Sequence, residues 1–126
     1  MDRVKVIIEL PWPDPKLHAH AKGHWRGKVN PTSTARAYCG LLCKQVTDRM
    51  QSASIRYRFY APDNLRRDAA NLVQACKPYV DGIVDAGIIP DDSWQFLRLA
   101  GVEVEIDKKR PRVVLELTEE SNERAA

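Results

Sequence analysis

Apolar and polar residues alternate in four stretches of the chain. Residues 3–10 and 54–61 follow this pattern, and their apolar positions are Val4, Val6, Ile8 and Leu10 in the first and Ile55, Tyr57 and Phe59 in the second. A period of two is typical of a strand that is buried on one face. Residues 95–106 and 112–118 alternate in the same way. Only the short segment DKKRP separates them, so we expect these two stretches to form a hairpin.

Two other stretches have helical spacing. Residues 33–50 carry an apolar stripe (Ala35, Tyr38, Cys39, Leu42 and Val46), with Thr32 or Ser33 as a plausible N-cap. Residues 69–86 predict a second helix. Pro78 lacks an amide proton and would crowd the carbonyl of Gln74, which predicts a kink or restart near Lys77. Gly87 suits the position just after the helix. Residues 16–31 are rich in Lys, His and Gly and read as a long loop.

The order strand, helix, strand, helix, strand, strand predicts an α+β fold, in which two main helices pack on a mixed β-sheet. The 126 residues suit one compact domain, which we expect over residues 1–118 with a frayed tail over 119–126. No apolar run approaches the roughly 20 residues of a membrane span, and the first residues do not resemble a signal peptide. We therefore expect a cytoplasmic protein without a membrane partner, in which Cys39, Cys43 and Cys76 are free thiols.

Charge is distributed unevenly between the two halves of the chain. Residues 1–67 hold 13 Lys and Arg against 5 Asp and Glu (13 − 5 = +8), whereas residues 68–126 hold 7 against 12 (7 − 12 = −5). Such a chain could bind a polyanion with its basic half and a cation with its acidic half. The alternative is that both sets of charges are simply solvated at the surface.

Two neighbouring aspartates in the stretch GIIPDDSW raise a question about charge. At about 6 Å and an effective dielectric constant near 20, Asp91 and Asp92 repel each other by roughly 3 kcal/mol. A bound cation would offset this repulsion, and a solvated loop would screen it. Asp68 is a third candidate acid, and the alternative for it is an N-cap. A straight helix of 18 residues would hold Asp68 about 27 Å from the pair.

Basic residues in two segments are candidates for contact with DNA. Arg66 and Arg67 directly precede Asp68, and a second group surrounds Trp25, namely Lys22, Arg26 and Lys28. Phosphate contact combined with base stacking is one interpretation of the second group, and a solvated loop is the other. His18, His20 and His24 have a spacing that could bind zinc, but no Cys lies nearby and the segment is basic.

Four motifs together resemble the RusA family of Holliday junction resolvases. They are LPWP at residues 10–13, RRDxxNL at 66–72, KPxxDGxxDAG at 77–87 and PDD at 90–92. The resemblance implies an α+β homodimer that binds four-way DNA junctions and nicks two strands symmetrically with Mg²⁺ or Mn²⁺. It also implies that Asp68, Asp91 and Asp92 hold the metal, with Asp92 slightly favoured over Asp91, and that Lys77 assists.

The chain departs from the family pattern at two positions. The second acid of the first motif falls at Ala70, so the site has one carboxylate fewer, and the neighbouring Asn71 could supply only a neutral oxygen ligand. Lys77 also lies three residues later than the family spacing. We therefore weigh a junction endonuclease against a branched-DNA-binding protein with weakened or lost catalysis, and against a small protein-interaction domain.

Overall fold

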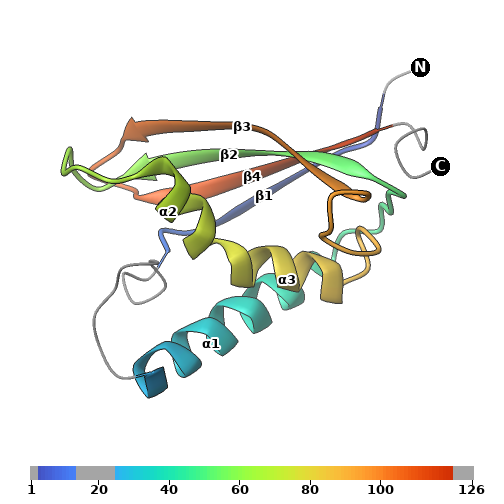
Figure 1. Cartoon of the computed structure of the whole chain (residues 1–126), viewed down its shortest axis with the longest axis horizontal. Coiled ribbons are helices and arrows are strands. Elements are labelled where there is room, and N and C mark those ends of the chain that lie inside the picture. The colour runs from blue at the N-terminus through green and yellow to red at the C-terminus, as the bar shows by residue number, and fades with distance from the viewer. Residues whose placement is uncertain (1–2, 14–24, 121–126) are drawn as a thin grey trace.

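The computed structural model describes residues 3–13 and 25–120, with only the backbone for residues 25–30. A four-stranded mixed sheet forms one layer and the helices form a second layer on one of its faces (Figure 1). The predicted α+β class, with helices packed on a mixed sheet, is confirmed. No helix within the described residues is long and apolar enough to cross a membrane.

The strand order is β1-β4-β2-β3. The edge strand β1 (Lys5–Pro11) runs antiparallel to β4 (Arg112–Glu119), which is also antiparallel to β2 (Ala53–Ala61). The other edge strand, β3 (Leu97–Ile106), pairs with β2 in parallel. The strands predicted at residues 3–10 and 54–61 are therefore confirmed as β1 and β2, as is the alternation of buried and exposed side chains along them.

The predicted hairpin between residues 95–106 and 112–118 is wrong. Both segments form strands, but β4 lies between β1 and β2, and β3 lies on the far side of β2. The burial of the two strands gives the physical reason. Val113, Leu115 and Leu117 of β4 are fully buried, which suits a central strand, whereas most side chains of β3 remain exposed.

The first helix differs from its prediction at both ends. Helix α1 spans Trp25–Cys43 and contains Pro31, so residues 25–31 are helical rather than loop. The sequence WRGKVNP disguises this start, because Gly and Pro usually mark a loop. The helix ends before the predicted Met50. Met50 is buried and donates its amide proton to Ile88 O at 2.8 Å. This bond holds Met50 beside the segment that follows α3.

The predicted second helix is confirmed with its break. Helix α2 (Ala69–Ala75) ends at Cys76, and helix α3 (Lys77–Asp85) restarts at once, with Pro78 in its first turn. A proline is tolerated there because the amide proton that it lacks has no partner in the first turn. Gly87 follows with φ +83°, a conformation that side chains with a Cβ rarely adopt.

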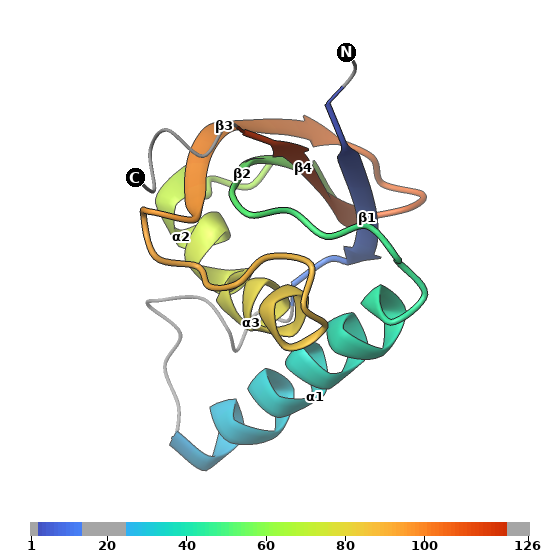
Figure 2. The same cartoon turned by 90° about the vertical axis from the view of Figure 1, so that its right-hand side faces the viewer.

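Helices α1 and α3 lie side by side beneath the sheet (Figure 2). Their approach depends on Gly82, because a Cβ there would lie 2.6 Å from Arg36 O and 2.9 Å from Gly40 N. A bidentate ion pair joins the same helices, since Arg36 donates to the two Asp85 carboxylate oxygens at 2.7 and 2.8 Å. Together these contacts fix the position of α3, which carries Lys77 and Asp81.

Candidate functional site

The LPWP segment joins the end of β1 to the helices. The Trp12 ring packs edge-on against Phe59 with centroids 6.0 Å apart, and the Arg67 guanidinium lies 5.3 Å from the Trp12 ring centre. Tyr79 of α3 donates its hydroxyl proton to Pro11 O at 2.9 Å. Sequence positions 10–13 and 66–72, which lie far apart in the chain, are thus neighbours in the fold.

Asp68 opens onto a pocket of about 260 Å³, which we call the Asp68 pocket; it is lined by Arg66, Arg67, Asp68, Asn71 and Leu72. Asp68 occupies the N-cap position of α2, but its side chain makes no capping hydrogen bond. Its carboxylate instead accepts a long hydrogen bond, 3.4 Å, from the Asn71 amide. The capping explanation for this acid therefore fails, and the carboxylate faces the pocket with a single weak partner among the described residues.

The two arginines of this pocket differ in their partners. Arg67 forms an ion pair with Asp63 at 2.7 Å and donates to the carbonyl oxygens of Asp63 and Leu65, both at 3.2 Å. These bonds, together with the contact to Trp12, hold the loop before α2. Arg66 is exposed. It is therefore the better placed of the two for phosphate, and the predicted DNA contact of both arginines stays a prediction.

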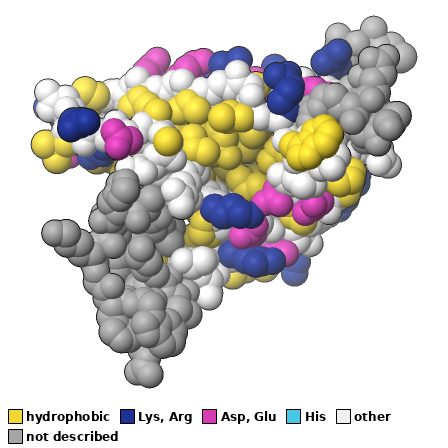
Figure 3. Space-filling model, in the orientation of Figure 1, with side chains coloured by type: hydrophobic (Ala, Val, Ile, Leu, Met, Phe, Trp, Pro, Cys, Tyr) yellow, Lys and Arg dark blue, Asp and Glu magenta, His cyan; other side chains and the backbone are white. Residues whose placement is uncertain are grey.

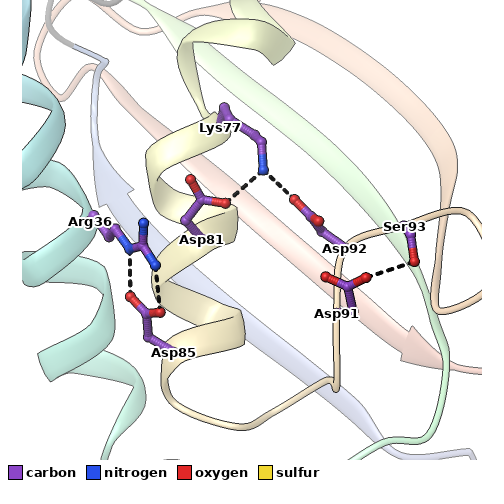
Figure 4. Close-up of polar contacts among 7 residues, drawn as sticks. All are labelled: Arg36, Lys77, Asp81, Asp85, Asp91, Asp92 and Ser93. Carbon is purple, nitrogen blue, oxygen red and sulfur yellow. Dashed lines mark hydrogen bonds and ion pairs between the residues drawn. The ribbon is translucent and has the colours of Figure 1, made fainter.

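A second group of side chains gathers at the start of α3, and we call Lys77, Asp81 and Asp92 the Lys77 cluster (Figure 4). Lys77 Nζ donates to Asp81 Oδ1 at 2.6 Å and also to Asp92 Oδ2. Partial burial lowers the pKa of Lys77, but its hydrogen bonds to the two carboxylates outweigh that effect and leave the pKa raised. The ammonium group is therefore charged at neutral pH and joins two acids of the RusA-like motifs.

The adjacent acids Asp91 and Asp92 point to different partners, as Figure 4 shows. Asp91 Oδ2 accepts the Ser93 hydroxyl proton at 2.8 Å, and this bond, together with the amide groups of Asp92 and Ser93, lowers the pKa of Asp91. Asp91 thus stabilises its own turn, whereas Asp92 reaches across to α3. Burial raises the pKa of the core residue Tyr57, and the Asp92 carboxylate nearby adds to that rise.

The acids do not converge on a single point. Among the described residues, no group of three or more His, Cys, Asp or Glu side chains could hold a metal ion. Asp81 and Asp92 nevertheless approach each other closely enough to share the Lys77 ammonium. Mg²⁺ is often held by one or two carboxylates and completed by water and substrate phosphate. The donor chemistry of this pair fits such an ion. Asp68 and Asn71 lie apart from it, in the Asp68 pocket.

Sequence reasoning did not identify Asp81 as a site residue. The available signal was its spacing of four residues from Lys77, which places the two side chains on the same face of a helix. Ala70, where the family motif has an acid, is exposed on α2. The three cysteines are free and buried, as expected. Lys22, His18, His20 and His24 lie outside the described residues, as do the side chains of Arg26 and Lys28.

Comparison with known proteins adds one relative. The sequence matches no family profile. Over 90 residues it is 31% identical to an uncharacterized protein of Xylella fastidiosa (strain Temecula1), a match that covers 67% of this chain and 59% of that protein. The chain thus spans about three fifths of this relative, whose name carries no activity. The resemblance to RusA resolvases stays a prediction.

Proposed function

We propose that this chain is a metal-dependent endonuclease that resolves four-way DNA junctions, as a homodimer in the cytoplasm. The observation that carries the proposal is the Lys77 cluster. Its members come from two separate RusA-like motifs, residues 77–87 and 90–92, and Lys77 hydrogen bonds to both acids. A cation with two carboxylates at a surface that is partly open to solvent suits the chemistry of phosphodiester cleavage.

Each residue of the two groups would have a separate role in phosphodiester cleavage. Asp81 and Asp92 would hold Mg²⁺ or Mn²⁺, which when bound polarises the phosphate and lowers the pKa of a bound water. Lys77, once released from the two carboxylates, would place its positive charge against the phosphate oxygens. Asp68 and Asn71 are a second set of oxygen ligands, and Arg66 at the rim of the same pocket would contact the DNA backbone.

A second candidate function is binding of branched DNA without efficient cleavage. Two observations favour it. Lys77 already supplies a positive charge between the two carboxylates, and Ala70 removes one acid from the family pattern. Under this interpretation the ammonium group serves in place of the metal ion, and the arginines still bind phosphate.

One assay separates the two functions. The protein is incubated with a synthetic four-way junction and with a linear duplex of the same sequence, each with and without Mg²⁺. The endonuclease predicts symmetric paired nicks in the junction that require Mg²⁺. Retarded mobility of the junction with no nicks at any Mg²⁺ concentration would support the binding protein, and equal affinity for both DNAs would contradict both functions.

A further inference from the structure

Three apolar side chains on the helix side of edge strand β3 remain about half exposed. On β2, the side chains toward the helices are buried, with Ile55 2% and Phe59 1% exposed. The side chains beside them on β3 are not, since Leu99 is 56%, Val104 48% and Ile106 53% exposed. Figure 3 shows this band of hydrophobic side chains below β3, with charged side chains along its lower rim. An uncovered edge of this kind is a ready partner for another strand.

The register of β3 against β2 defines which residues share a face. The pairing shifts by one residue because β3 has an extra residue, Ala100, between the partners of Ile55 and Arg56. Leu97 and Leu99 before it and Val102, Val104 and Ile106 after it therefore lie on the helix side. Arg98 and Glu105 lie on the opposite face. The strand is therefore basic near its beginning and acidic near its end.

We infer that β3 pairs with β3 of a second copy in antiparallel orientation, which joins two sheets of four strands into one. If the two strands overlap over their full length, Leu97 faces the partner's Ile106, Leu99 faces the partner's Val104, and Arg98 faces the partner's Glu105. A two-fold axis makes each of these contacts twice. A shift by one residue would place leucine against glutamate, and a parallel arrangement would place like charges side by side.

The opposite edge of the sheet lacks this complementarity. On β1, the helix-side residues Val6, Ile8 and Leu10 are buried. The outward charges of β1 already have partners within the chain, because Lys5 pairs with Glu116 and Glu9 with Arg110 and Arg112. Glu105 of β3 is exposed and has no ion pair among the described residues. Arg98 pairs with Glu120 of its own chain through Nε and Nη2, so in the dimer it would bridge Glu120 and the partner's Glu105.

The arrangement also bears on the proposed function. Antiparallel pairing at an edge relates the copies by an axis perpendicular to the sheet, so the helices of both copies lie on one face. Two Lys77 clusters would then face the same side of the dimer, as paired nicking of a symmetric junction requires. The pairing itself rests on β3 alone and does not depend on nuclease activity.

Reversal of charge tests the pairing without DNA or metal. In analytical ultracentrifugation at tens of micromolar, wild type should sediment at about twice the 14.3 kDa chain mass. Arg98→Glu and Glu105→Arg should each raise the dimer dissociation constant about tenfold, because like charges then face each other twice. An equimolar mixture of the two variants should dimerise like wild type, since every Arg again faces a Glu.

The control is Lys5→Glu on β1, which makes the same charge change as Arg98→Glu and should leave the dimer intact. Circular dichroism of each variant establishes that it is folded. A monomeric wild type would overturn the inference, and so would a dimer that both single variants leave unchanged. A dimer that behaves as expected but cuts no junction would leave this inference standing and refute the proposed endonuclease.

Discussion

The Lys77 cluster and the Asp68 pocket lie at opposite ends of the short helix α2, and they hold their acids in different ways. Asp81 and Asp92 converge on one ammonium group. Asp68 faces a pocket of about 260 Å³ with only a long hydrogen bond from Asn71. The first group has a positive charge built in, whereas the second has the weakly partnered carboxylate. Under the proposed function, the cluster is the catalytic centre, and the pocket positions DNA or supplies a further ligand.

Replacement of the positively charged Lys77 should have the largest effect on cleavage. Lys77→Met keeps the length of the side chain but removes the ammonium group from both carboxylates. We expect junction cleavage at saturating Mg²⁺ to fall about a hundredfold, because a cation near the phosphate is lost. The Mg²⁺ concentration for half-maximal cleavage should fall at the same time, since Asp81 and Asp92 become free. Cleavage that rises at every Mg²⁺ concentration would mean that Lys77 only blocks the site.

The position of the cluster depends on close packing of α3 against α1. Gly82→Ala should destabilise the fold by about 1–3 kcal/mol in urea unfolding, because its Cβ would overlap backbone atoms that have little room to move. Gly40→Ala is the matched control. The nearest atom to its Cβ would be Gly82 O at 3.8 Å, so we expect no loss of stability, or a gain of up to about 1 kcal/mol from better helix propensity. Equal losses in both variants would refute the proposed contact.

Restoration of the missing acid tests whether the pocket belongs to the metal site. Ala70 is exposed on α2, so Ala70→Asp should be tolerated by the fold. If Asp68 and position 70 bind the same ion, the Mg²⁺ concentration for half-maximal cleavage should fall severalfold, because a charged ligand binds a hard cation better than a neutral one. An unchanged Mg²⁺ titration would place this position outside the coordination shell and leave the Lys77 cluster as the whole site.

The smallest expected effect separates the two arginines of the pocket. Arg66→Ala should reduce the slope of log K against log salt for junction binding by roughly 0.9, which corresponds to one lost phosphate contact. Arg67→Ala should leave that slope nearly unchanged and instead lower stability, because Arg67 holds Asp63 and lies over Trp12. A salt slope that changed only in Arg67→Ala would show that Arg67, rather than Arg66, contacts phosphate.

Local patterns predict much of this molecule. The period of two located β1 and β2, and the missing amide proton of Pro78 located the break before α3. Strand order could not be obtained in the same way, because both β3 and β4 alternate and only their burial decides which one is central. The start of α1 was hidden by Gly27 and Pro31, residues that usually end helices.

The candidate site shows the same division between local and long-range information. Motif resemblance identified Lys77 and Asp92, but their contact depends on how the segment after α3 returns to the start of that helix. Asp91 and Asp92 cannot be told apart by sequence spacing. Only the fold separates them, because the Ser93 hydroxyl takes one and Lys77 the other.

Paired aspartate variants test the central claim most directly. Asp92→Asn and Asp48→Asn make the same chemical change, one in the Lys77 cluster and the other at an exposed aspartate between α1 and β2. With the four-way junction at saturating Mg²⁺, Asp92→Asn should cut at least about a hundredfold more slowly than wild type and still bind the junction, because it removes a carboxylate from the metal pair. Asp48→Asn should cut like wild type. Equal rates in wild type and Asp92→Asn would contradict the account.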